Sequence, residues 1–364
     1  MKKNHFIVFL LCFLMLFASA GCQVADFFTA KTPTETTIES VLPNDKTDQT
    51  GDTDIPEDNA DKTGNTTVTP TVCNVSIVYN NGESDGHISV QQGQTFSAPQ
   101  DPVKTHYIFT GWYTSAGLNA KYDFSKSVQH DVTIYAGYSL DAVSLTNTIT
   151  TETIKGVVKV RNKCFNKSFM GTSFATSQGS GFCFDIEDGT YYILTNCHVA
   201  KKIAGYSQQE YTIEDYQGNE FKGNLCQNHD KTVDSIAAEY DLACLCFKPE
   251  TVTDIRVLPF ADLDPAINDD IILLGAPQNQ SNAITYGVVR TYTTIQVTAS
   301  PEESNVTFGV IESSAYSDHG SSGGATLNSN LQIVGVSYAG NSEKTKSYSI
   351  PITKVKEFLT LYYY

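Results

Sequence analysis

Short apolar runs separated by turn residues dominate the sequence after about residue 150, and they limit the folds open to it. The clearest runs are residues 156–160, 191–195, 242–247, 271–274 and 333–336. They are rich in Val, Ile, Leu and Tyr and are too short for typical helices, so they predict strands. Only residues 352–361 predict a helix, because apolar side chains such as Val355 and Leu359 recur there at helical spacing. We therefore expect residues 150–364 to form an all-β domain of two packed β-barrels with a C-terminal helix.

A second, smaller set of alternating apolar runs lies between residues 73 and 139. These runs are residues 75–79, 88–90, 107–109 and 132–136. Turn residues such as Asn81-Gly82 and Gly93 separate them, which is typical of a small β domain. Trp112 is the only tryptophan of the chain, and we expect it at the centre of this domain's core.

Residues 73–139 resemble the Listeria–Bacteroides type of bacterial surface repeat, a small β-grasp-like module. The motifs that carry the resemblance are Val78-Tyr79-Asn80-Asn81-Gly82, Phe109-Thr110-Gly111-Trp112-Tyr113, Tyr122-Asp123-Phe124-Ser125 and Thr133-Ile134-Tyr135-Ala136. The resemblance implies a stalk or a weak binding unit without catalytic residues. We expect a stalk, and a cell-surface ligand of the repeat is the alternative.

The first residues have the pattern of an export signal. Two lysines precede an apolar run over residues 6–17, which is shorter than the roughly 20 residues that span a membrane, so residues 1–21 predict a cleaved signal peptide. Ser19-Ala20-Gly21-Cys22 resembles a bacterial lipoprotein box, which implies a lipid on the Cys22 sulfur. We expect a secreted protein anchored to the outer face of the bacterial membrane. Ordinary secretion and a permanent membrane helix are the alternatives.

Residues 22–72 are mostly Thr, Asp, Asn, Pro, Glu and Gly, and they predict a disordered acidic tether because they can bury little apolar surface. The formal net charge of −16 also argues against a nucleic-acid partner, since phosphate binding needs clustered Lys and Arg.

The nine cysteines do not predict a complete set of disulfides. With Cys12 in the signal and Cys22 lipidated, the remaining seven are an odd number. Cys244 and Cys246 would lie about 6.6 Å apart on one strand face with parallel side chains, so we do not pair them with each other. Small buried apolar side chains are their expected role. The absence of Cys-x-x-Cys pairs and His-rich tracts predicts no metal site, and no cofactor is expected.

Three residues after position 150 have the side-chain types that acyl transfer requires. Gly320-Ser321-Ser322-Gly323-Gly324 places a serine among glycines, where the backbone can expose the hydroxyl and nearby N–H groups. His198 follows one apolar strand, and Asp241 begins another. A nucleophile, a base and donors for the oxyanion are the components of such a site, and the order His, Asp, Ser is that of chymotrypsin-like enzymes.

With this order in place, residues from about 150 to 364 resemble a trypsin-like serine protease domain, closest to the bacterial Deg and glutamyl-endopeptidase-like branches. The matching stretches are Gly179-Ser180-Gly181-Phe182, Leu194-Thr195-Asn196-Cys197-His198-Val199, Asp241-Leu242-Ala243, Leu274-Gly275-Ala276-Pro277, Tyr286-Gly287-Val288-Val289, Gly320-Ser321-Ser322-Gly323-Gly324 and Val334-Gly335-Val336-Ser337.

The resemblance implies a role for each matching residue. Ser322 would be the nucleophile, His198 the general base and Asp241 the residue that orients the histidine, with the N–H groups of Gly320 and Ser322 as the oxyanion hole. The wall of the specificity pocket would comprise Ser337, Tyr338, Ala339 and Gly340, with its floor near Tyr316. Since no acidic residue falls at that floor, a preference for Arg or Lys is not implied. The expected partner is a protein or peptide substrate. The alternative is a catalytically idle protease-fold protein that acts in binding or adhesion.

Overall fold

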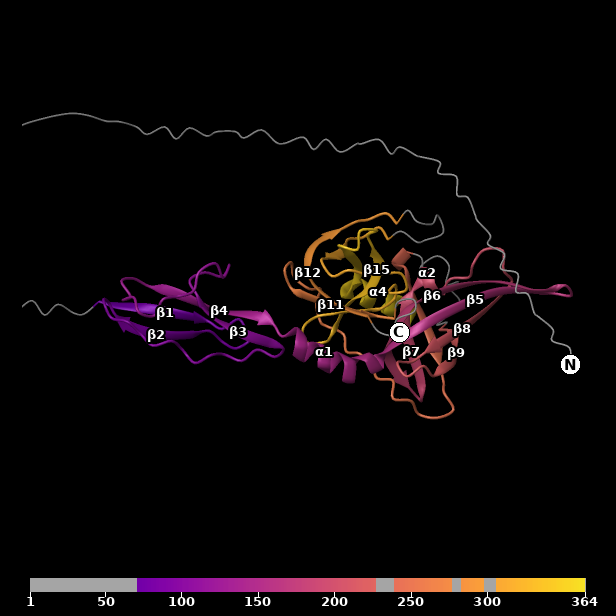
Figure 1. Cartoon of the computed structure of the whole chain (residues 1–364), viewed down its shortest axis with the longest axis horizontal. Helices are drawn as coiled ribbons and strands as arrows, with labels where there is room; N and C mark the ends of the chain where they lie inside the picture. The colour runs from indigo at the N-terminus through magenta and orange to yellow at the C-terminus, as the bar shows by residue number, and fades with distance from the viewer. Residues whose placement is uncertain (1–70, 227–238, 277–282, 298–305, 364) are drawn as a thin grey trace, which may run out of the picture. The chain divides into compact units, whose positions relative to one another are not determined.

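The computed structural model describes residues 71–226, 239–276, 283–297 and 306–363. The predicted signal peptide, Cys22 and the predicted tether up to residue 70 lie outside the described residues. The described chain is mostly β, with one small sheet and two closed six-stranded barrels (Figure 1). The expected all-β class is confirmed. Within the described parts of the chain, no helix is both long and apolar enough to cross a membrane.

The small sheet has the strand order β2-β1-β4-β3, and β1 pairs with β4 in parallel. Its strands are β1 (Val72–Val78), β2 (Gly86–Gln91), β3 (Tyr107–Tyr113) and β4 (Val132–Leu140). Alternate residues of β1 are buried, because successive side chains of a strand point to opposite faces. Trp112 is 4% exposed and packs edge-on against Tyr79 and Phe109, at ring-centroid distances of 5.9 Å and 5.5 Å. It lies within the core of this sheet, together with the fully buried Ile134.

The first barrel closes in the order β10-β7-β6-β5-β8-β9. Its strands are β5 (Val157–Ser168), β6 (Gly171–Glu187), β7 (Thr190–Asn196), β8 (Gln208–Glu214), β9 (Glu220–Leu225) and β10 (Leu242–Phe247). Antiparallel pairing of β7 with β10 sets Asn196 opposite Leu242, so the end of one strand adjoins the start of the other. The four-residue helix α2 (Cys197–Ala200) follows β7 directly.

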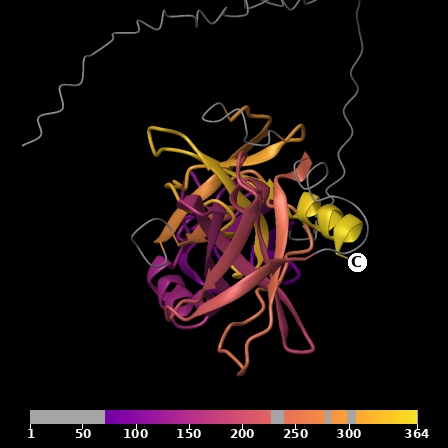
Figure 2. The ribbon, with the colours of Figure 1, turned by 90° about the vertical axis from the view of Figure 1, so that its right-hand side faces the viewer.

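The second barrel closes in the order β11-β12-β13-β16-β15-β14. Its strands are β11 (Asp270–Gly275), β12 (Ala283–Thr293), β13 (Val310–Ser313), β14 (Ala325–Leu327), β15 (Ile333–Gly340) and β16 (Ser347–Pro351). The helix α4 (Ile352–Tyr362) follows β16, which confirms the predicted C-terminal helix. Figure 2 shows α4 in yellow beside the C-terminus. Its Val355, Phe358 and Leu359 are buried.

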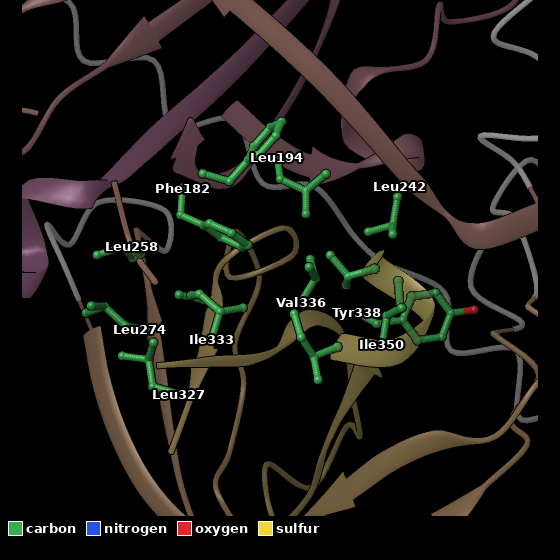
Figure 3. Packing of buried hydrophobic residues seen from close by; sticks show 14 of the residues in the cluster. Phe182, Leu194, Leu242, Leu258, Leu274, Leu327, Ile333, Val336, Tyr338 and Ile350 are labelled. Atoms are coloured by element: carbon green, nitrogen blue, oxygen red, sulfur yellow. The ribbon is translucent and has the colours of Figure 1, made fainter. Parts of the chain in front are cut away.

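The largest hydrophobic core contains residues of both barrels and of α4. Figure 3 shows part of it, including Leu194 of the first barrel and Ile333 of the second. Leu194 and Leu242 come from the first barrel, and Ile272 and Val336 come from the second. The residues next to these in the same strands fill the barrel interiors instead. Ile193, next to Leu194, belongs to a cluster inside the first barrel, and Ile271, next to Ile272, belongs to one inside the second. Both faces of these strands are therefore buried, which explains why their sequences are continuous apolar runs.

A helix that the sequence analysis did not predict precedes the first barrel. Helix α1 spans Ala142–Thr151, and the 3₁₀ turn η1 spans Thr153–Gly156. Asp141 caps α1 by accepting a hydrogen bond from the Ser144 N–H at 3.0 Å. Leu145 and Ile149 are fully buried in the core shared by the barrels. The helix therefore packs against this core through side chains one helical turn apart.

The substitution Ile134→Ala should destabilise the small sheet by about 2 to 5 kcal/mol, because it removes a fully buried side chain from a packed core. Urea unfolding followed by tryptophan fluorescence would measure the loss, since Trp112 is the only tryptophan and lies in the same core. Val103→Ala is the matched control, because Val103 is 85% exposed. Equal unfolding midpoints for the two variants would contradict the packing described above.

Candidate active site

The ring of His198 and the carboxylate of Asp241 form a hydrogen bond, with Nδ1 2.7 Å from Oδ2. The backbone N–H of His198 donates to the other carboxylate oxygen, Oδ1, at 2.9 Å. The His198 side chain is 18% exposed, whereas that of Asp241 is fully buried. The imidazole thus has one edge fixed by a buried anion, and part of the ring remains open to solvent.

Strand pairing explains why these two residues meet. Asp241 directly precedes β10, and its carbonyl accepts hydrogen bonds from the Cys197 N–H at 3.0 Å and from the Asn196 side chain at 2.9 Å. The backbone of Asp241 has φ +49°, in the left-handed region that aspartate tolerates better than most residues. This turn leads the chain into β10 and leaves the carboxylate facing the first turn of α2.

Ser322 lies in a loop in which some backbone N–H groups donate backbone hydrogen bonds and others do not. Ser321 N–H donates to the Asp318 carbonyl at 3.0 Å, Gly323 N–H to the Ser337 carbonyl at 2.8 Å, and Gly324 N–H to the Ser321 carbonyl at 2.9 Å. Within the described residues, no backbone hydrogen bond of this loop uses the N–H of Gly320 or of Ser322. These are the two donors that the sequence analysis assigned to an oxyanion hole.

Two glycines give this loop its conformation. Gly320 has φ +94°, a backbone region that side chains rarely adopt. Gly323 has φ +85°, and a Cβ there would clash with the Ser180 carbonyl oxygen and the Thr195 Oγ1. The residue after Ser322 therefore packs directly against the strand end that leads to His198.

Ser180 of β6 holds the same loop from the first barrel. Its N–H donates to the Ser322 carbonyl at 2.8 Å, and its hydroxyl donates to the Gly320 carbonyl at 2.7 Å. The hydroxyl also accepts from the Ala276 N–H at 2.8 Å, at the end of β11. Ser180 thus binds three backbone groups of the second barrel. Ser180 stands in one of the stretches that match the protease domain, but its sequence context predicts no role for it.

The residues assigned to a specificity pocket have different environments. Ser337 and Tyr338 are buried, Ala339 is half-buried, and Gly340 and Tyr316 are exposed. A Cβ on Gly340 would lie 2.8 Å from the Ser317 carbonyl oxygen, so the end of β15 adjoins the segment that contains Tyr316. The Ser337 hydroxyl is buried and makes no hydrogen bond within the described structure.

An ion pair lies beside the loop of Ser322, between Asp318 and Lys344 at 2.6 Å. The hydrogen bond from Lys344 and the bond from the His319 N–H lower the pKa of Asp318 below its usual value. The Lys344 pKa is raised by the same contact. Both side chains are largely exposed, so we assign this pair to the protein surface rather than to the site. Among the residues described, no group of three His, Cys, Asp or Glu is placed to hold a metal ion.

Comparison with known proteins identifies two domains. Residues 179–336 match the trypsin-like peptidase domain, and residues 75–137 match the Listeria-Bacteroides repeat domain. This chain carries a trypsin-like peptidase domain. The resemblances to a trypsin-like protease domain and to the surface repeat are confirmed.

Several curated serine proteases are similar to the peptidase domain. The Serine protease Do-like HtrA of Bacillus subtilis is 30% identical over 205 residues, which cover 52% of this chain and 42% of that protein. The Putative serine protease HhoA of Synechocystis is 30% identical over 205 residues, which cover 53% of this chain and 46% of that protein. The chain therefore matches less than half of the length of these relatives.

Among solved structures, the active form of the Rv3671c protease from M. tuberculosis is 22% identical with a TM-score of 0.45. The match covers 60% of this chain and 86% of that chain.

The substitution Ser180→Ala should destabilise the peptidase domain by about 1 to 3 kcal/mol, because it leaves the Gly320 carbonyl and the Ala276 N–H without their partner. Chemical denaturation followed by far-UV circular dichroism would measure the change. Ser173→Ala is the control, since Ser173 is exposed on the same strand. An unfolding free energy equal to that of the unaltered protein would show that the hydrogen bonds of the Ser180 hydroxyl contribute nothing to stability.

Proposed function

We propose that this protein is an extracytoplasmic serine endopeptidase, in which Ser322, His198 and Asp241 form the catalytic triad. The observation that carries the proposal is the 2.7 Å hydrogen bond between His198 Nδ1 and the buried Asp241 carboxylate. A second observation supports it, since no backbone hydrogen bond in the described structure uses the N–H of Gly320 or of Ser322. Relatives named as serine proteases favour the same reaction.

The proposed reaction divides peptide hydrolysis into two steps through an acyl-enzyme. His198 Nε2 takes the proton of the Ser322 hydroxyl as its oxygen bonds to the substrate carbonyl carbon, and then gives that proton to the leaving amine. A water molecule next attacks the ester, again with His198 as the base, and releases the carboxylic acid product and the free hydroxyl. Asp241 would fix the tautomer with the proton on Nδ1 and stabilise the imidazolium that forms in each step.

The oxyanion of each tetrahedral intermediate would accept hydrogen bonds from the N–H groups of Gly320 and Ser322. In comparable enzymes one such donor contributes about 3 to 4 kcal/mol to transition-state stabilisation. The hydrogen bonds from Ser180 to the carbonyls of Gly320 and Ser322 support this role, because they fix the peptide unit that directly follows each of the two donor residues. We therefore regard Ser180 as a positioning residue for the proposed oxyanion hole.

We further propose that the protein acts outside the cytoplasm. A lipid on Cys22 would tether it to the membrane, and the repeat domain would act as a stalk for the peptidase domain. The apolar run followed by Ser19-Ala20-Gly21-Cys22 supports export and lipidation. A relative from Haemophilus influenzae is named a probable periplasmic serine protease, which fits an extracytoplasmic site of action. The exposed Tyr316 and the segment Ser337–Gly340 remain the proposed contacts for the substrate residue before the cut.

The nucleophile is tested by comparing Ser322→Ala with the matched control Ser321→Ala. A fluorophosphonate probe should label the unaltered protein and Ser321→Ala but not Ser322→Ala, because the probe reacts with an activated serine oxygen. Turnover of a fluorescent casein substrate should fall about 10⁶-fold in Ser322→Ala, as in other serine proteases. If the unaltered protein is not labelled at neutral or mildly alkaline pH, the idle binding protein replaces the peptidase as the favoured function.

The lipid anchor is tested by growing expressing bacteria with an alkynyl fatty acid. The unaltered protein should carry the label and sediment with membranes, whereas Cys22→Ser should lose the label, because only Cys22 follows the lipoprotein-box motif. Cys73→Ser controls for the loss of a cysteine elsewhere and should remain labelled. A soluble, unlabelled wild-type protein would favour ordinary secretion.

A further inference from the structure

Three cysteines converge where β9 ends beside β10. Cys226 directly follows β9, and its N–H donates to the Cys244 carbonyl at 2.9 Å, so the two residues lie directly opposite each other. The pairing of Leu245 with Leu225 sets the same register. The sulfur of Cys244 lies 2.9 Å from that of Cys226. Cys246 is two residues further along the same face of β10, where its thiol also interacts with Cys226.

The backbone geometry at this position fits a disulfide bond. Directly opposite residues of a hydrogen-bonded antiparallel pair have Cα atoms about 5.5 Å apart, within the range of about 4.4 to 6.8 Å that disulfides require. Cys246 is diagonal to Cys226, and such pairs have Cα atoms about 7 to 8 Å apart, which is too far without movement of the backbone. Within the described residues the three thiols do not form a group placed to hold a metal ion.

We propose that Cys226 and Cys244 are a redox site of this protein and form a disulfide bond by exchange with a small-molecule disulfide. The proposal concerns a covalent modification, and it does not rest on the proposed peptidase activity. Sequence spacing alone suggested only Cys244 and Cys246 as neighbours. The cross-strand partner becomes visible when β9 is paired with β10.

The thiol–disulfide exchange proceeds in two steps. Cys226 is the more exposed of the pair, since Cys244 is only 8% exposed, so Cys226 is expected to react first. It loses its proton and attacks one sulfur of the reagent, which forms a mixed disulfide and releases one small thiol. Cys244 then loses its proton and attacks the Cys226 sulfur, which forms the protein disulfide and releases the second small thiol. Two protein thiols are oxidised, and one small-molecule disulfide is reduced.

The environment of the thiols makes this exchange slow. The hydrogen bond with Cys244 and burial raise the pKa of Cys226, and the contact with Cys226 and burial raise the pKa of Cys246. Little of the reactive thiolate is therefore present at neutral pH. The reaction should be followed over hours and with an excess of the reagent.

The disulfide would close a covalent loop of the chain that contains Asp241, which lies three residues before Cys244. The two cysteines are 18 positions apart in the chain, and a bond between them would restrict the unfolded chain more than the folded one. Oxidation should therefore raise the melting temperature of the peptidase domain by about 5 to 10 °C. It would also hold the start of β10 against the end of β9, next to the strand position from which Asp241 reaches His198.

The test uses the purified full chain incubated with oxidised or reduced glutathione. Free thiols are then blocked with an alkylating reagent under denaturing conditions, and the digest is mapped by mass spectrometry. We expect a peptide that joins Cys226 to Cys244 only after oxidation, together with the rise in melting temperature measured by circular dichroism. In Cys226→Ser the peptide and the temperature shift should both be absent. In Cys246→Ser and in the control Cys164→Ser both should persist.

Two results would overturn the proposal. One is complete alkylation of Cys226 and Cys244 after prolonged oxidation of a folded protein. The other is a bond that joins Cys226 to Cys246 or to another chain. Mapping requires no catalysis, so these results are distinct from a failure of fluorophosphonate labelling, which bears on the proposed peptidase alone.

Discussion

Apolar burial between the two barrels is the constraint on which the candidate site depends. Leu194 and Leu242 lie in the shared core beside Ile272 and Val336 of the second barrel. Burying one such side chain fully contributes about 1.5 to 3 kcal/mol, and the core combines many of them. The strands that carry these residues also bring His198 and Asp241 together, because His198 lies two residues beyond the end of β7 and Asp241 directly precedes β10. The strands that form the core therefore also position this part of the candidate site.

The carboxylate of Asp241 is fully buried, so its burial must be compensated by hydrogen bonds. A charge removed from water is costly unless hydrogen bonds replace its hydration. Here the His198 ring and the His198 backbone N–H each approach one carboxylate oxygen, at 2.7 Å and 2.9 Å. The same bonds that compensate burial also fix the direction of the imidazole. Stability and orientation of the histidine therefore come from one set of contacts.

Much of the fold could be predicted from the sequence because its signals are local. The continuous apolar runs predicted β5, β7 and β10 of the first barrel and β11 and β15 of the second. The helical spacing of Val355 and Leu359 predicted α4. Helix α1 was not predicted, because it is rich in threonine, which favours helices weakly. Several of its hydroxyls, such as that of Thr146, bond to the carbonyl one turn earlier. Leu145 and Ile149 are the buried residues of this helix, and their burial depends on the core that the barrels share.

The pairing of His198 with Asp241 could be anticipated from chain order and from their positions at strand ends. The role of Ser180 could not, because its hydroxyl meets a carbonyl 140 positions later in the chain, at Gly320. Neither a spacing nor a local pattern encodes such a contact. The same is true of Cys226, whose relation to Cys244 depends on the register of two strands.

Ser180 also shows how the two halves of the candidate site depend on each other. The proposed base and its carboxylate belong to the first barrel, whereas the loop of Ser322 belongs to the second. Ser180 of the first barrel contacts this loop directly through its N–H and its hydroxyl. Within the first barrel, the Thr195 hydroxyl donates to the Ser180 carbonyl at 2.6 Å. The absence of a side chain at Gly323 allows this close approach. Since neither barrel contains a complete set of groups, the proposed triad can assemble only when both barrels have folded and packed together.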